Sequence, residues 1–289
     1  MNTLKTTALL ALLTGLLLAV GAFFGGTKGM TFMFVVSILM NFVSYWFSDK
    51  IVLSMYGARE VTVKEAPELI RMVSNLAQKA KMPMPKVYIM DTDVPNAFAT
   101  GRDPEHAAVA ATTGIMRALS YEELEGVMAH ELAHVKNRDT LISTIVATVA
   151  GVITMIANIA QWTAIFGMGR SDDEDGGGIA GIVELVFLII LAPLAATLIQ
   201  LGISRAREFQ ADETGGLIAG NPLALASALQ KIEYYAQHRT MPEATPATSH
   251  MFIINPFSGA GDWMVKLFST HPTTAQRVAK LQELAKKVR

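Results

Sequence analysis

The stretch SYEELEGVMAHELAHVKN, residues 120–137, decides how the rest of the sequence is interpreted. Ser120 is followed three residues later by Glu123, the spacing of a capping box, so a helix is predicted to start there and to run to about the end of the stretch. His130 and His134 stand four residues apart within it. That spacing places both imidazoles on one face of the helix, one turn from each other, where they can bind the same metal ion.

The residue between the two histidines suits a hydrolytic role. Three protein ligands and a water molecule are typical of a catalytic zinc site. Zinc lowers the pKa of such a water and polarises a substrate carbonyl. Glu131, on the adjoining flank of the helix, would take the proton of the water and pass it to the leaving amine. The alternative is a pair of surface histidines, but the five-residue pattern arises by chance in only about one such sequence in a hundred.

A third metal ligand must come from another part of the chain. By residue type the candidates include many carboxylates and the histidines His106, His238, His250 and His271. We favour Glu208, in the segment SRAREFQAD at residues 204–212. Asp212 lies four residues further on, shares a helix face with Glu208, and could accept a hydrogen bond from a zinc-bound histidine. The alternative for this segment is a solvated face of paired charges.

Composition narrows the class of protein. Hydrophobic residues make up 51% of the 289 residues and charged residues 17%, whereas an ordinary soluble domain has about 25% charged residues. The chain is therefore predicted to be a membrane protein. It has no cysteine, which excludes disulfides, thiolate metal sites and a cysteine nucleophile. The net charge of −1 offers no basic excess for a nucleic-acid partner, and we expect none.

Four apolar stretches approach or exceed the length that a membrane-spanning helix needs. They are residues 6–24, 30–47, 141–166 and 179–203. The first could alternatively be a cleaved signal peptide. The third and fourth are interrupted by polar residues and could instead pack inside the protein. Lys and Arg near the span ends gather on the side of the two termini, which predicts that this side is cytoplasmic.

These spans divide the chain into a membrane part and a hydrophilic part. Residues 1–47 would form two N-terminal spans, and residues 141–203 a hairpin of two more. Residues 48–140 and 204–289 would pack together as one cytoplasmic domain, into which that hairpin is inserted. The metal ligands would then lie about 7–10 Å beyond the ends of the hairpin, at 1.5 Å per helical residue. We therefore expect the metal close to the membrane surface.

The hydrophilic part is predicted to be α+β and mostly helical, with a small sheet. The expected helices are 66–80, 121–137, 205–218, 222–237 and one that begins near Pro272, and the expected strands are 87–90, 97–100 and 107–113. Residues 239–262 are rich in Pro, Gly, Ser and Thr and are predicted to form a long loop.

With these residues in place, the chain resembles the HtpX family of membrane zinc proteases, which is related to the proteases that act on prenylated CAAX proteins. HELAH at residues 130–134, the apolar stretches, and SRxREFxAD at 204–212 carry the resemblance. It implies a zincin-like (gluzincin) domain with one Zn²⁺ per chain and Glu208 as the third ligand. It also implies an endopeptidase of the bacterial inner membrane that cleaves membrane or unfolded proteins near the cytoplasmic face in quality control.

Two shorter motifs match the same family. PNAFATG at residues 95–101 resembles the strand that binds the substrate backbone, which makes Asn96, Ala97 and Phe98 candidate substrate-binding residues. The alternative is an ordinary edge strand. STHP at residues 269–272, followed by Arg277, resembles a motif near the active site. There His271 could stabilise the oxyanion of the tetrahedral intermediate or serve only to cap a helix.

Two other functions remain open from the residues alone. A zinc-dependent membrane hydrolase could act on a substrate other than a peptide. A membrane scaffold or transporter could use the histidines structurally or for a transported ion, but Glu184 is the only acidic residue inside the predicted spans, which argues against an ion pathway. The sequence does not indicate an oligomeric state.

Overall fold

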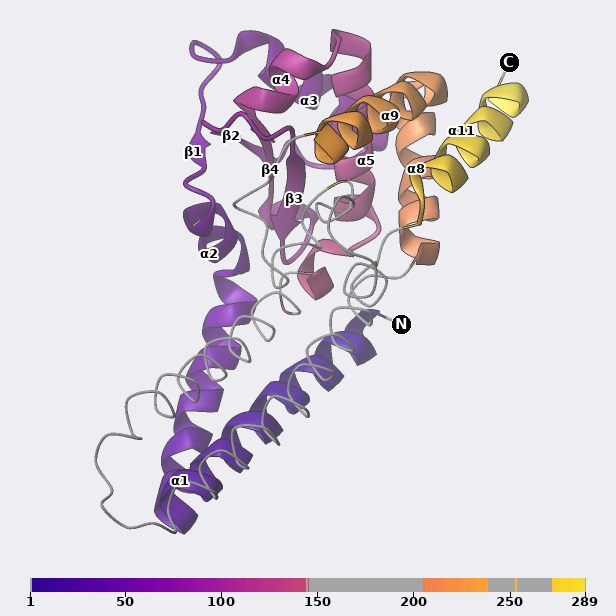
Figure 1. The fold of residues 1–289 in the computed structure, drawn as a ribbon. Coiled ribbons are helices and arrows are strands. Elements are labelled where there is room, and N and C mark those ends of the chain that lie inside the picture. The colour runs from indigo at the N-terminus through magenta and orange to yellow at the C-terminus, as the bar shows by residue number, and fades with distance from the viewer. Residues whose placement is uncertain (1, 144, 146–204, 239–252, 254–271, 289) are drawn as a thin grey trace.

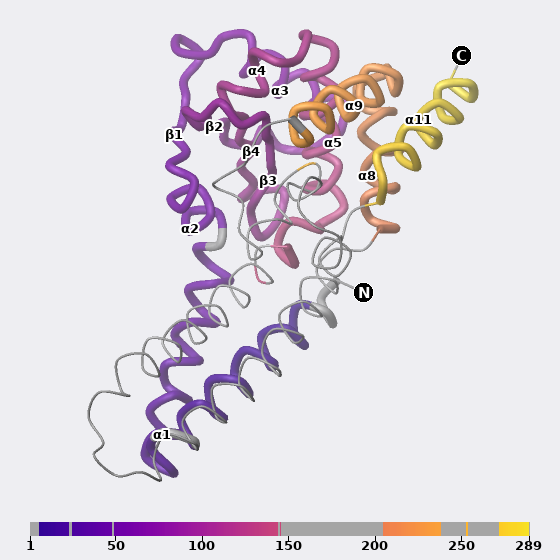
Figure 2. Tube along the Cα trace, viewed as in Figure 1, coloured from indigo at the N-terminus to yellow at the C-terminus, as the bar shows by residue number. Residues whose placement is uncertain are grey.

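A computed structural model of the chain describes residues 2–143, 145, 205–238, 253 and 272–288. Its first element, α1 (Asn2–Trp46), is a helical hairpin, because the backbone at Gly26 has φ 55° and ψ −141° and reverses the chain. The turn is the end of the hairpin farthest from the β-sheet (Figures 1 and 2). The Asn41 amide donates a hydrogen bond to Thr14 Oγ1 at 2.9 Å and links the two helices of the hairpin.

The second helix of the hairpin is the better candidate for a membrane span. Among the described helices, Gly25–Trp46, with 22 residues, is the one long and apolar enough to cross a bilayer. Thr6–Ala22 is apolar but shorter. Of the predicted third and fourth stretches, residues 141–143 and 145 are helical, and the remainder lies outside the described residues. The prediction of four spans therefore stays a prediction.

The described part of the chain forms one mixed sheet. Its strands are β1 (Arg59–Glu60), β2 (Lys86–Met90), β3 (Ala97–Gly101) and β4 (Ala107–Thr112). Their order is β1-β2-β4-β3; β2 and β4 are parallel, and the two outer strands are antiparallel to their neighbours. The three predicted strands are all present, and β3 lies at one edge of the sheet. The short β1 was not predicted, because two residues carry no alternating pattern.

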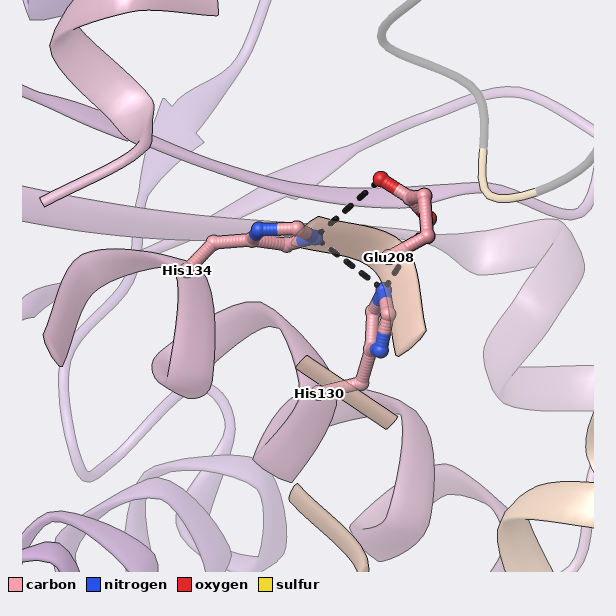
Figure 3. A group of neighbouring side chains, drawn as sticks. All are labelled: His130, His134 and Glu208. Carbon is pink, nitrogen blue, oxygen red and sulfur yellow. Dashed lines mark hydrogen bonds and ion pairs between the residues drawn. The ribbon is translucent and has the colours of Figure 1, made fainter. Parts of the chain in front are cut away.

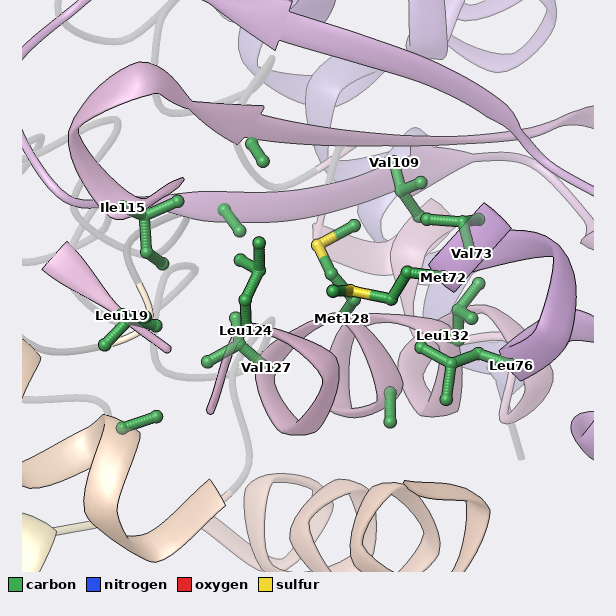
Figure 4. Packing of buried hydrophobic residues seen from close by; sticks show 14 of the residues in the cluster. Met72, Val73, Leu76, Val109, Ile115, Leu119, Leu124, Val127, Met128 and Leu132 are labelled. Atoms are coloured by element: carbon green, nitrogen blue, oxygen red, sulfur yellow. The ribbon is translucent and has the colours of Figure 1, made fainter. Parts of the chain in front are cut away.

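Helices cover both faces of this sheet. One face packs on α2 (Ser48–Met55), where Val52 and Leu53 share a buried cluster with Phe98 of β3. The other face packs on α3 (Pro67–Ala80) and α5 (Tyr121–Lys136), and this larger cluster is the main core. Figure 4 shows Met72 of α3 and Met128 of α5 meeting beneath the sheet. Because successive side chains of a strand point to opposite faces, both clusters draw on the same strands.

Side-chain caps explain where the helices around the sheet begin. The capping box predicted for α5 is present: Ser120 and Glu123 each hydrogen-bond to the backbone N–H of the other. The strand predicted to reach residue 113 ends one residue earlier. There Thr112 Oγ1 accepts a hydrogen bond from the N–H of Ile115 at 3.0 Å and caps the short helix α4 (Thr113–Ala118). A single 3₁₀ turn (Pro104–His106) joins β3 to β4.

Three further helices complete the described chain. They are α8 (Arg205–Ala219), α9 (Pro222–His238) and α11 (Thr274–Val288). Each matches a predicted helix, although α11 begins two residues after Pro272. Thr273 caps it, because its hydroxyl accepts a hydrogen bond from the N–H of Gln276 while the Gln276 side chain accepts one from the N–H of Thr273. Apart from Ile253, the predicted loop 239–262 lies outside the described residues.

Candidate metal centre

The two histidines lie on the buried half of α5. His130 is almost fully buried, with 2% of its side chain exposed, and His134 is 16% exposed. The start of the helix is also held in place, because the Glu123 carboxylate accepts hydrogen bonds from Ser227 and Lys231 of α9, each at 2.7 Å. The helix that carries the histidines is therefore anchored both by its core face and by its capping residue.

Helix α8 brings the third residue of the cluster to the histidines. It crosses α5 at Gly215, where a β-carbon would lie only 2.7 Å from the backbone Cα of His130. Only glycine permits that approach. Glu208 lies two turns earlier on α8 and is buried. Figure 3 shows its carboxylate facing both imidazole rings.

The separations between the three side chains suit a metal ion. His130 Nε2 and His134 Nε2 are 3.2 Å apart, and the Glu208 oxygens lie 3.8 Å and 3.6 Å from them, respectively. Zinc bonds of about 2.0–2.2 Å in a tetrahedral site would place ligand atoms about 3.3–3.6 Å apart. Two imidazoles and a carboxylate are also ligand types that zinc accepts. The residues present therefore fit a divalent metal.

Asp212 and Arg277 support His130. His130 Nδ1 lies 3.0 Å from Asp212 Oδ1. Because an ionised carboxylate can only accept, this contact places the proton on Nδ1 and leaves the Nε2 lone pair as the metal-binding atom. Arg277 Nη2 also lies 3.3 Å from Nε2. Arg277 of α11 is buried and donates to both oxygens of Asp212, at 2.8 Å and 2.6 Å. Burial alone would raise the pKa of Asp212, but the charge and hydrogen bonds of Arg277 lower it to about 2.

Asp139 and Arg207 stand in a similar relation to His134. Asp139 Oδ2 is 3.5 Å from His134 Nδ1, and Arg207 Nη1 is 3.9 Å from the other oxygen of Asp139. Burial disfavours the charged imidazole, but the hydrogen bond with Asp139 and the charges of Glu208 and Glu131 raise the pKa of His134 to about 9. A metal that binds His134 must therefore displace the proton on the Nε2 atom of the charged imidazole.

Glu131 lies beside the cluster and is also buried. Its Oε2 accepts a hydrogen bond of 3.0 Å from the backbone N–H of Ala99 in β3. Burial raises the pKa of Glu131, and the negative charge of Glu208 adds to the increase, while the two histidines oppose it. A carboxylate with a raised pKa beside a candidate metal site has the properties expected of a general base.

Comparison with known proteins identifies the family. The profile of peptidase family M48 matches residues 63–285. The chain belongs to peptidase family M48. M48 relatives named "Protease HtpX homolog" include one from Thermodesulfovibrio yellowstonii, 57% identical over 99% of this chain and 100% of the relative. Another, from Pyrococcus furiosus, is 56% identical over 97% of this chain and 95% of the relative. The resemblance to the HtpX family and the prediction of a metalloprotease are thus confirmed.

A solved structure shares the fold of this M48 chain. The crystal structure of S. mikatae Ste24p superposes with a TM-score of 0.50 and 19% sequence identity. The match covers 97% of this chain and 65% of that chain. At this identity the likeness concerns the fold alone, and it agrees with a mostly helical chain that carries a small mixed sheet.

Strand β3 lies beside the candidate metal site of this M48 chain. Its register with β4 determines which of the candidate substrate-binding residues face the open edge of the sheet. Asn96 O accepts a hydrogen bond from the N–H of Thr112, so its backbone faces the neighbouring strand β4. Hydrogen-bonded and non-bonded pairs alternate along an antiparallel ladder. The backbone groups of Ala97 and Ala99 consequently face the open edge, whereas the Phe98 side chain packs against Tyr56 in the core with ring centroids 5.2 Å apart.

Among the other candidate ligands, the structure describes the side chain of His106. Within the described residues, the group of potential metal ligands that lie within reach of one another is His130, His134 and Glu208. His106 pairs with Asp103 on the surface at 2.6 Å. The side chains of His238, His250 and His271 lie outside the described part of the structure.

Sequence reasoning missed three residues that support this M48 site. Arg277 was noticed only as part of a motif, and Asp139 and Arg207 were given no role. A signal existed for Asp139, because α5 ends at Lys136 and a polar residue just after a helix can fold back on its last turn. For Arg277 the signal was the resemblance of its segment to a motif near the active site. Its partner Asp212 lies 65 residues away in the chain, so no local pattern could identify the pair.

Proposed function

We propose that this M48 peptidase is a zinc-dependent endopeptidase of the bacterial inner membrane. One zinc ion per chain is bound by His130, His134 and Glu208 in a gluzincin-type domain. The observation that carries the proposal is the convergence of these three side chains from α5 and α8 at the spacing of a tetrahedral site. Family membership favours a peptide substrate over the non-peptide hydrolase and over the scaffold or transporter.

The chemistry is divided between the metal and Glu131. When bound, zinc supplies Lewis-acid activation of water and of the scissile carbonyl. The Ala99 N–H holds the Glu131 carboxylate at the cluster. Glu131 accepts a proton from the attacking water and donates it to the leaving amine. Asp212 and Asp139 hold the protons of the histidine Nδ1 atoms, so that both Nε2 atoms point into the site.

The substrate is an extended polypeptide that pairs with the open edge of β3. The outward N–H and C=O of Ala97 and the outward C=O of Ala99 offer hydrogen bonds to such a strand, whereas the Ala99 N–H is donated to Glu131. Asn96 and Phe98 contribute by holding β3 in register, because their own groups are used inside the sheet and its core. His271, which lies outside the described residues, is retained as the oxyanion-stabilising residue.

The bilayer is the second partner. Large apolar side chains of the second helix of the hairpin are exposed, including Phe32 at 67% and Leu39 at 62%, and such a surface is costly in water. This supports a span in the second helix, and the apolar composition of Thr6–Ala22 supports the other of the two spans proposed for residues 1–47. The unit formed by residues 48–140 and 204–289 and the hairpin at 141–203 complete a four-span topology with cytoplasmic termini. The substrates are then membrane or misfolded proteins near the cytoplasmic face.

Glu131→Gln tests the function directly. Glutamine keeps the shape of the side chain but cannot accept the proton, so casein cleavage by detergent-purified protein should fall by at least about 10²-fold, the lower end of general-base contributions. Zinc content, measured on the same sample by elemental analysis, should be unchanged.

Glu208→Ala serves as the complementary variant. It removes a carboxylate oxygen from the cluster, so it should lose both zinc and activity. Equal casein cleavage by Glu131→Gln and wild type would refute the catalytic assignment, and a full zinc complement in Glu208→Ala would refute the ligand assignment.

A further inference from the structure

The carboxyl end of β3 contacts the N-terminal hairpin and also the residue that precedes the third apolar stretch. Arg102, the residue after the strand, donates a hydrogen bond of 3.4 Å to Trp46 O, and its guanidinium lies 5.1 Å from the centre of the Trp46 indole. Trp46 ends the helix that is long enough to span a bilayer. Gly101 O accepts a hydrogen bond of 2.8 Å from the Thr140 hydroxyl, and the third apolar stretch begins at the next residue.

A packed core reinforces this attachment. Helix α2 follows directly after the membrane helix, and its Val52 and Leu53 pack with Phe98, the second residue of β3. Tyr56, just after α2, stacks on the same phenylalanine. The strand is therefore joined to the hairpin through buried side chains as well as through the two contacts at its end.

The same strand contacts the catalytic residue Glu131 at a fixed distance from that end. Glu131 is hydrogen-bonded to Ala99, three residues before Arg102. At about 3.3 Å per residue, the site lies at most about 10 Å along the strand from the residue that touches Trp46. Tryptophan at the end of a membrane helix is typical of the interface between lipid and water.

We infer that β3 sets the height of the cleaved bond above the membrane. An integral-membrane substrate would then be cut at a set number of residues from the end of its span, rather than at a preferred sequence. A substrate strand beside β3 has the same rise, and the interfacial zone adds about 5–7 Å to the ~10 Å along β3, so the cut falls at most about five residues from the span. This inference rests on the proposed function and specifies how its site selects a bond.

The test uses full-length wild-type protein in lipid nanodiscs with a single-span reporter substrate. The cytoplasmic segment next to its span is built from one short repeated unit, and mass spectrometry identifies the cleaved bond. A second reporter carries an insertion of about four residues, or about 13 Å of extended chain, next to the span. We expect cleavage at the same number of residues from the span in both reporters, so that the cleaved bond moves to a new place in the sequence.

Two results separate this inference from the proposed function. If wild type leaves both reporters intact, or if Glu131→Gln cleaves them equally well, the proposed function fails. If cleavage depends on Glu131 but follows the original sequence after the insertion, or scatters along the repeat, the distance inference fails and the function stands.

A variant of the contact at the strand end provides a second test. Arg102→Ala removes both the hydrogen bond and the ring contact with Trp46, so cleavage of the reporter should spread over neighbouring bonds while casein cleavage is retained. Arg117→Ala is the matched control, since Arg117 is an exposed arginine that pairs with Asp93 and has no described contact with the hairpin. An unchanged cleavage pattern in Arg102→Ala would show that the contact between Arg102 and Trp46 does not set the distance of the cleaved bond from the span.

Discussion

At the scale of single residues, each histidine of the cluster is paired with a carboxylate, and each carboxylate with an arginine. His130 is paired with Asp212 and Arg277, and His134 with the carboxylate of Asp139. A carboxylate behind a metal-binding histidine fixes the ring orientation and raises its basicity. The two pairs differ in strength, because the contact at His130 is 3.0 Å and that at His134 is 3.5 Å.

Asp139→Asn should weaken zinc binding without abolishing it. The amide keeps the shape of the side chain but not its charge, so the preference for a proton on His134 Nδ1 is reduced. Loss of such an outer partner typically lowers metal affinity about 10–100-fold. We expect the lower end of that range, measured by competition with a chromogenic zinc chelator.

Asp103→Asn is the matched control for that measurement. It alters a histidine–carboxylate pair at His106 on the surface, outside the cluster, so the zinc affinity should stay at the wild-type value. Wild-type affinity in Asp139→Asn would show that Asp139 does not support the site.

At the scale of elements, the site depends on how closely α8 approaches α5. The histidines come from one helix and Glu208 from the other, so the ligand separations depend on the distance between the two helices. Gly215 sets that distance, because its missing β-carbon leaves room for the backbone of His130. Close packing transmits small changes of this kind, since interiors have few voids to absorb them.

Gly215→Ala should displace α8 and reduce the zinc content. The added methyl group would meet backbone atoms of α5, which cannot rotate away, and overpacking of this kind typically costs about 1–3 kcal/mol. Gly216→Ala, one residue further along α8, is the matched control. Its β-carbon would meet side-chain atoms of Leu284 and Pro222 at 3.2–3.3 Å, which can adjust more easily. Equal zinc content in the two variants would contradict this view of the helix crossing.

At the scale of the whole molecule, the hairpin and the domain form one structure rather than two units on a flexible linker. Helix α2 continues from the hairpin directly onto the sheet, and Arg102 closes a second contact with Trp46. The way the hairpin sits in a bilayer would therefore also set the orientation of the edge strand β3 and of the candidate metal site.

Cysteine labelling tests the proposed topology, and the natural chain suits it because it contains no cysteine. Lys28→Cys and Asp173→Cys lie in the two loops predicted to face outward, so a membrane-impermeant maleimide should label them in intact cells. Lys64→Cys and Lys287→Cys lie in the domain and should react only after lysis. Protection of Asp173→Cys in intact cells would contradict a crossing by the hairpin 141–203, and labelling of Lys64→Cys would reverse the orientation.

The sequence by itself determined the features that depend on neighbours within one or two turns. The capping box at Ser120, the spacing of His130 and His134, and most helix limits follow from local hydrogen bonds and from the period of the helix. The strand limits were nearly as accessible, although the cap formed by Thr112 ended β4 one residue early. Glu208 could be ranked first among the possible third ligands, but the residues alone left a solvated charged face open.

Only the tertiary structure decided which distant groups meet. Arg277 and Asp212 are 65 residues apart in the chain, and Glu131 and Ala99 are 32 apart, so no local pattern relates them. These contacts depend on how all the helices and strands pack together. A β-carbon added at Gly215 would change the distance between α5 and α8, and a shift of β3 by one residue would change which side chains it presents to each face. The free-energy differences between alternative packings are spread over the whole core, and a short stretch of sequence does not contain them.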